Sequence, residues 1–165
     1  MFAQGTARTK ESITMQCTID GLREDLEKQI RSFVNYDNVR VVRFYIGKSE
    51  TENFEERQST HRSEGYTDTL EIAHGNPTLI TQAEEILISY FQGSDLKGLL
   101  ANIDSNANGN NDADKLYVSY EAYLKESDTP ISIDELEDDE LNWPESYELI
   151  SSEEIVQKVI NKFRM

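Results

Sequence analysis

Five side chains between residues 45 and 102 are of types that bind anions, transfer protons or ligate metals. Tyr45 stands two residues before a glycine that ends a β-branched and aromatic run. Arg57 and His61 follow at a spacing of four, which places guanidinium and imidazole on one face of a helix. Glu84 begins the apolar part of a later helical pattern, and Asn102 follows that helix. The spacing predicts a polar site where a strand end meets two helices.

The order of these residues resembles that of the GIY-YIG nuclease family. Four motifs of the family are matched in the same order along this chain. The YIG motif is matched by Tyr45-Ile46-Gly47, and the Arg-x-x-x-His motif by Arg57 and His61. The Glu-x-x-Leu-Ile helix is matched by Glu84 with Leu87 and Ile88, and the late asparagine by Asn102. The resemblance covers roughly residues 39–105, about half the chain, or a little more if it begins near residue 12.

This resemblance implies phosphodiester hydrolysis with one divalent metal, Mg²⁺ or Mn²⁺, on a small three-stranded antiparallel sheet flanked by helices. Glu84 would hold the metal, which prefers oxygen ligands and keeps several waters. Arg57 would bind a phosphate oxygen through its planar donors. Tyr45 would act at the attacking water and His61 would carry a proton or bind phosphate. Asn102 would steady the site by hydrogen bonds.

The first half-motif of the family, a strand that ends in a tyrosine shortly before YIG, has no counterpart upstream of Tyr45. The candidate strand 13–19 contains no tyrosine, and Tyr36 falls in a turn-forming cluster. Two functions therefore stay open: a DNA endonuclease, or a catalytically inactive binding or regulatory protein on the same fold. A third possibility, an acidic mimic of DNA, follows from the net charge of −16.

The periodicity of the sequence predicts an α+β fold. Strands are expected over 13–19, 39–46 and 67–73, where β-branched or aromatic residues alternate or cluster. Helices are expected from Asp20 to about residue 34, over the polar stretch 49–62, over 78–91 and over the final segment from Ser151. A short apolar element is expected over 96–103, and periodicity leaves residues 116–124 open between strand and helix.

The charge distribution divides the chain into a domain over residues 1–125 and an acidic extension over 126–165. The segment from Glu126 to Glu140 holds eight acidic residues and is expected to be an exposed linker, with a short helix started by Ser132, that could bind a protein partner. In the first domain, Arg40, Arg43, Lys48 and Arg62 could form a local basic face that binds DNA.

Composition predicts an intracellular protein, cytoplasmic or nuclear, that does not associate with a membrane. The chain has 165 residues, a single cysteine at position 17 and no long apolar run. The run Asp104–Asp112 matches the opening of an EF-hand calcium loop. However, Lys115 stands where the loop needs a bidentate glutamate, so a true EF-hand is not expected.

Overall fold

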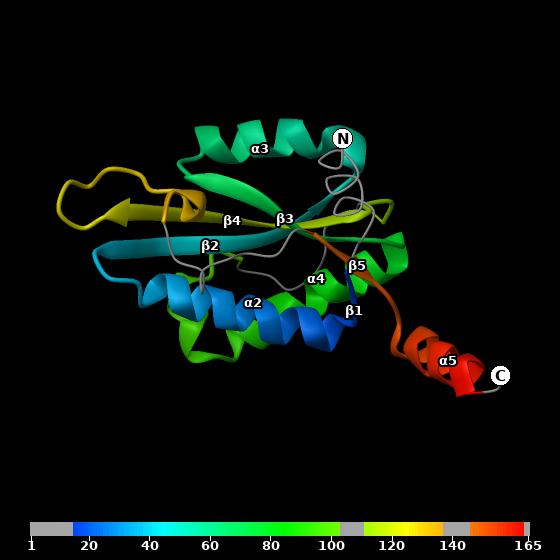
Figure 1. Cartoon of the computed structure of the whole chain (residues 1–165). Helices are drawn as coiled ribbons and strands as arrows, with labels where there is room; N and C mark the ends of the chain where they lie inside the picture. The colour runs from blue at the N-terminus through cyan, green and yellow to red at the C-terminus, as the bar shows by residue number, and fades with distance from the viewer. Residues whose placement is uncertain (1–14, 103–110, 137–145, 164–165) are drawn as a thin grey trace, which may run out of the picture.

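The computed structural model describes residues 15–102, 111–136 and 146–163 (Figure 1). Within them the chain forms, in order, β1 (Gln16–Cys17), α2 (Ile19–Val34), β2 (Val39–Ser49), α3 (Phe54–Ser63), β3 (Asp68–His74), α4 (Pro77–Gln92), β4 (Lys115–Leu124), β5 (Tyr147–Leu149) and α5 (Ser152–Phe163). Short 3₁₀ helices η1 (Thr51–Asn53), η2 (Asp95–Leu99) and η3 (Ile133–Glu135) connect them.

The sheet corrects the expected architecture. The fold is α+β, but its sheet is mixed and has five strands in the order β1-β5-β3-β4-β2, and is not a small three-stranded antiparallel sheet. Strands β2, β4 and β3 pair antiparallel, whereas β5 pairs parallel with both β1 and β3. The short strand β5 thus brings residues 147–149 of the acidic extension into the sheet.

Helices cover both faces of the sheet (Figure 1). Helix α3 lies on one face, and α2 and α4 lie side by side on the other. The main core lies between the sheet and α2 and α4, where apolar residues recur at helical spacing along each helix; among the buried ones are Leu22, Leu26, Ile30, Ile80, Leu87 and Phe91. Edge-to-face ring contacts join helix to strand, with centroids 5.0 Å apart for Phe33 and Tyr120 and 5.4 Å for Phe91 and Phe44.

Strand β4 lies between β2 and β3 and is buried over most of its length. Its residues alternate between the two faces, so that Leu116 and Val118 join the main core while Tyr117 and Ser119 point toward α3. On the α3 side, the hydroxyl groups of Ser119 and Thr69 of β3 share a buried hydrogen bond of 2.6 Å. The face under α3 is therefore aromatic and polar, unlike the aliphatic face under α2 and α4.

The remaining elements agree with the sequence in part. The helix expected over 49–62 begins only at Phe54, because β2 continues to Ser49 and η1 follows it. Residues 116–124, for which periodicity favours neither strand nor helix, belong to the strand β4. Ser132 starts η3 through a capping box with Glu135. The expected strand over 13–19 is confined to Gln16–Cys17 within the described residues, because α2 already begins at Ile19. The candidate calcium loop falls almost wholly outside the described residues, and no helix in the described part is long and apolar enough to cross a membrane.

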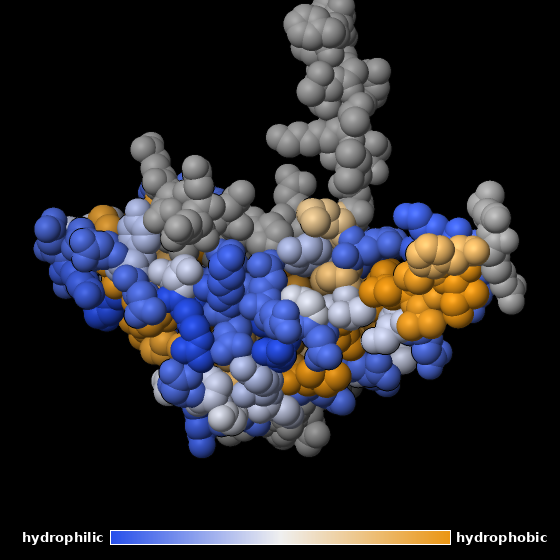
Figure 2. All heavy atoms as spheres, turned by 60° about the horizontal axis from the view of Figure 1, so that its bottom comes forward, coloured by the Kyte–Doolittle hydropathy of each residue, from blue (hydrophilic) through white to orange (hydrophobic). Residues whose placement is uncertain are grey.

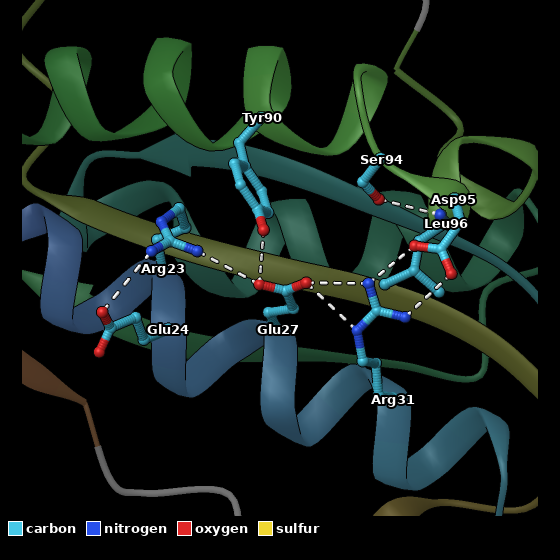
Figure 3. A network of polar contacts seen from close by, with 8 residues as sticks. All are labelled: Arg23, Glu24, Glu27, Arg31, Tyr90, Ser94, Asp95 and Leu96. Carbon is cyan, nitrogen blue, oxygen red and sulfur yellow. Dashed lines mark hydrogen bonds and ion pairs between the residues drawn. The ribbon is translucent and has the colours of Figure 1, made fainter.

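A network of charged groups joins α2 to α4 and η2 on the outer side of the core (Figure 3). The Glu27 carboxylate accepts hydrogen bonds from Tyr90 Oη at 2.7 Å and from Arg31 Nη2 at 2.9 Å, and it also pairs with Arg23 at 3.2 Å. Arg31 in turn binds Asp95 at 2.7 Å. The hydrogen bonds from Tyr90 and Arg31 hold the pKa of Glu27 below its ordinary value.

We expect replacement of Glu27 by glutamine to lower the free energy of unfolding by about 1 kcal/mol, because three donors lose a charged acceptor. The stabilisation is present above the ordinary pKa of 4.5 and is lost as the pH falls through the lower folded value, so wild type and variant should converge in acid. Urea denaturation at several pH values measures this. Glu24→Gln is the matched control, since Glu24 is 74% exposed and lies 3.7 Å from Arg23; an equal effect of both changes would contradict the network's role.

Candidate functional site

Two tyrosines meet on the α3 face of the sheet at the end of β2. In the pairing of β2 with β4, Gly47 lies opposite Tyr117, and the Tyr117 ring covers the glycine. A Cβ at position 47 would lie 2.5 Å from both Cζ and Oη of Tyr117, which is too close for any side chain. The ring centroids of Tyr45 and Tyr117 are 6.4 Å apart. Gly47 is thus required for Tyr117 to enter the site.

Helix α3 adds His61 to these tyrosines. His61 Nε2 lies 3.0 Å from Tyr117 Oη, and its ring centroid lies 5.1 Å from that of Tyr45. Tyr66, just beyond α3, packs edge-on against the same imidazole at 5.2 Å. His61 is 7% exposed and is the buried residue of α3, which also contacts the sheet through Phe54, packed on Tyr117, and through Gln58, which donates to the Thr69 carbonyl.

The surroundings of His61 favour a neutral imidazole. Burial lowers its pKa, the nearby Glu64 carboxylate opposes that shift, and Arg57 and Arg43 add to it. Nδ1 lies 3.3 Å from Glu64 Oε1 without forming a well-aligned hydrogen bond. A proton on Nδ1 would face this carboxylate, which leaves Nε2 to accept the hydrogen bond from the Tyr117 hydroxyl.

We expect the His61 imidazole to titrate below 6.5, the ordinary value for histidine. Because the unfolded chain then binds more protons than the folded one, this residue should make stability fall as the pH drops below 6.5 toward the folded pKa. NMR titration of the histidine ring protons measures the pKa, with His61→Asn to assign the signal. A His61 signal that titrates above 6.5 would contradict the buried, neutral assignment.

Glu84 and Lys48 form a buried ion pair between α4 and β2. The two side chains are 8% and 4% exposed, with Lys48 Nζ 3.8 Å from Glu84 Oε1. Lys48 also donates to Thr81 Oγ1 at 3.1 Å, whereas Glu84 Oε1 has no hydrogen-bond partner. Burial raises the pKa of Glu84, and the Lys48 charge partly offsets that rise. The carboxylate is therefore desolvated and incompletely satisfied.

Glu84 and Arg57 act electrostatically on the same tyrosines. Burial raises the pKa of both Tyr45 and Tyr117; the Glu84 carboxylate raises each further, and the Arg57 guanidinium lowers each. Arg57 is itself exposed on α3, one turn before His61. Tyr45, His61 and Arg57 therefore lie on the α3 side of the sheet, whereas Glu84 lies on the α4 side and acts on the tyrosines only through its charge.

Asn102, the fifth predicted residue, holds the outer edge of β2. Its Oδ1 accepts from the Ile46 backbone N–H and its Nδ2 donates to the Ile46 carbonyl, both at 2.9 Å. The preceding residue, Ala101, donates its backbone N–H to Phe44 at 2.7 Å. The amide group imitates a neighbouring strand and fixes the backbone between Tyr45 and Gly47.

The cations predicted to bind DNA are placed differently from one another. Lys48 is buried against Glu84 and does not reach an exposed face. Arg43 pairs with Glu121 at 2.7 Å and stacks on a tyrosine ring, and Arg40 pairs with Asp128 at 3.1 Å. Arg62 is exposed near the end of α3. Arg57 and Arg62 are therefore the exposed cations on α3, the helix that carries His61.

Tyr117 is the member of the site that sequence reasoning missed. Three tyrosines lie within residues 116–124, and nothing in that segment separates Tyr117 from Tyr120, which belongs to the main core. The available signal was Gly47, since a glycine within a strand often marks the close approach of another group. Tyr66 and Glu64, which line His61, carried no signal in the sequence.

Comparison of the chain with models of known families, with curated proteins and with solved structures yields no match. Within the described residues, no group of three or more histidine, cysteine, aspartate or glutamate side chains could together hold a metal ion.

Proposed function

We propose that the protein is a divalent-metal-dependent endonuclease that hydrolyses DNA phosphodiester bonds. The observation that carries the proposal is the hydrogen bond between Tyr117 and His61 under α3, beside Tyr45 and one helical turn from the exposed Arg57. Glu84, buried on the opposite face of the sheet beside Lys48, adds a carboxylate whose charge acts on Tyr45 and Tyr117. The order of the predicted site residues along the chain also resembles that of the GIY-YIG nucleases.

The residues present fit one hard cation. Glu84 Oε1 is buried and lacks a hydrogen-bond partner, and its neighbouring cation, Lys48 Nζ, is 3.8 Å away, so a metal ion could bind there if Lys48 moved aside. Mg²⁺ needs few protein ligands, because it keeps several waters and takes oxygens from a bound phosphate. When bound, Mg²⁺ or Mn²⁺ would stabilise negative charge on the phosphate and on the leaving oxygen.

The protein's own groups would bind the phosphate and move the proton. Arg57, exposed at the rim, would hold a non-bridging phosphate oxygen. Tyr45 would orient the attacking water. The Tyr117 hydroxyl, hydrogen-bonded to His61 Nε2 at 3.0 Å, would take up a proton from that water while it passes its own to Nε2. Glu64, 3.3 Å from Nδ1, would stabilise the resulting imidazolium.

A second candidate is a catalytically inactive binding or regulatory protein, and the Lys48–Glu84 ion pair favours it. The ammonium group already neutralises the carboxylate and would repel a second cation. In the nuclease, Lys48 must release Glu84 when a metal binds; in the inactive protein it remains paired. The two functions therefore differ in whether Mg²⁺ or Mn²⁺ binds at Glu84.

The experiment that tests the proposal is incubation of the wild-type protein with supercoiled plasmid, linear duplex, single-stranded DNA and RNA at low salt, with Mg²⁺, Mn²⁺ or chelator. The nuclease should nick or cut at least one DNA substrate with metal and none with chelator. Cleavage of RNA alone would redirect the substrate assignment. Binding without cleavage on any substrate would favour the second candidate.

A further inference from the structure

Helix α5 presents a continuous apolar stripe to solvent. Five large apolar side chains lie along one side of the helix and are 37–83% exposed: Ile155, Val156, Val159, Ile160 and Phe163. Within its described length, α5 has no buried residue. Figure 2 shows hydrophobic side chains gathered in one patch toward the end of the molecule where α5 lies in Figure 1. A patch of this kind marks an interaction surface.

The helix is joined to the body of the protein through its polar side. Lys158 Nζ donates to Gln16 Oε1 of β1 at 2.8 Å. A hydrogen bond between Gln157 and Asn161 lies on the exposed surface of the helix. The apolar stripe is thus free to contact another molecule without displacement of α5 from the sheet.

The charges of α5 indicate what that molecule is. Glu153 and Glu154 lie in the first turn, and Lys158 and Lys162 lie in the second half, so the helix has no net charge in a chain of net charge −16. Two copies of the chain repel each other over most of their surface. They repel each other least at α5, where a neutral face is combined with exposed apolar area.

The same charges define how two such helices fit. A parallel pair would place glutamates beside glutamates and lysines beside lysines. An antiparallel pair places the acidic turn of one copy beside the basic turn of the other and also opposes the helix dipoles. We propose that the protein self-associates through antiparallel pairing of α5, with Val159 of the two copies at the centre of the contact.

This contact is small, so the dimer should form reversibly. Two three-turn helices bury less than the roughly 800 Å² per partner of a standard interface. We therefore expect a monomer–dimer equilibrium with a dissociation constant in the micromolar range or above. Contact between two α5 helices is enough to produce a dimer of this affinity. The proposal does not depend on the proposed nuclease function.

Sedimentation velocity of the full chain over a range of concentrations tests the proposal. The wild type should shift from monomer to dimer as its concentration rises. Val156→Glu with Val159→Glu should raise the dissociation constant at least about tenfold, because like charges then face each other. The matched control, Gln157→Glu with Asn161→Glu, adds the same charge on the polar side and should dimerise nearly as the wild type does. Unchanged thermal unfolding of the body would show that both variants are folded.

Distances between two nitroxide labels test the orientation of the paired helices. Each label is attached to one copy of the chain through Ser152→Cys, in a Cys17→Ser background. In an antiparallel pair centred on Val159, the two labels are about 20 Å apart along the helix axis. In a parallel pair they lie side by side, about 10 Å apart. A protein that stays monomeric at all concentrations, a dimer unaffected by the stripe variant, or labels at the shorter distance would each overturn the proposal.

Discussion

Glu84→Gln should abolish metal-dependent DNA cleavage, with a loss of about 10³-fold, because several kcal/mol of charge stabilisation depend on a cation at this carboxylate. The matched control is Glu85→Gln, the exposed neighbour on α4, which should cleave like the wild type. Calorimetric titration with Mn²⁺ should show a site in the wild type and in Glu85→Gln that is lost in Glu84→Gln. Equal cleavage by both variants would contradict the role of Glu84.

The buried ion pair makes a separate control for folding necessary. Removal of the Glu84 charge leaves Lys48 desolvated without a counter-ion, which should cost about 3 kcal/mol of stability. Replacement of both partners by apolar residues, Lys48→Met with Glu84→Leu, should restore most of that stability. Cleavage should remain absent in the double variant, so that loss of activity is distinguished from loss of the fold.

Gly47→Ala should lower both stability and activity through the side chain that it displaces. The new Cβ would lie 2.5 Å from Tyr117 Cζ and Oη, and Tyr117, 1% exposed, has no room to move outward. We expect a loss of about 1–3 kcal/mol from overpacking. We also expect roughly a 10²-fold loss of cleavage, because the Tyr117 hydroxyl leaves His61. Urea denaturation and initial cleavage rates measure the two effects.

Two further variants distinguish overpacking at Gly47 from loss of the Tyr117 hydroxyl contact. Gly98→Ala adds a Cβ that meets nothing within 4 Å, so neither the stability nor the cleavage rate should change by much. Tyr117→Phe keeps the ring but removes the hydroxyl that contacts His61 Nε2. It should be more stable than Gly47→Ala and still cleave poorly. If Gly47→Ala were as stable and as active as the wild type, the contact between β2 and Tyr117 would not be essential.

Elements with strong local patterns were predictable from the sequence. Helices α2 and α4 bury residues at regular helical spacing, and β2 is a long run of β-branched and aromatic residues. Strand β1 falls within the strand predicted over 13–19, but β5 was not predictable, because three residues are too short to show a period. Their pairing joins Gln16 to Glu148 across most of the chain, and only tertiary packing brings them together.

The site was predictable only in part, for a related reason. Tyr45, Arg57 and His61 lie on adjacent elements, so spacing along the chain could bring them together. The position of Tyr117 depends on the register between β2 and β4, which the sequence does not display. The same register determines which face each strand residue occupies, and this explains why Lys48, predicted to bind DNA, instead lies buried against Glu84.

The most direct test of the proposed hydrolysis is single-turnover cleavage of a DNA substrate by the wild-type protein with Mg²⁺ in ¹⁸O-labelled water. Hydrolysis at this site predicts a cleaved product whose new terminal phosphate carries one ¹⁸O atom, with no product from Glu84→Gln or in the presence of chelator. No cleavage by folded wild-type protein with either Mg²⁺ or Mn²⁺ would contradict the proposed hydrolysis and identify the site as an inactive one. Cleavage that persists in Glu84→Gln would contradict it as well.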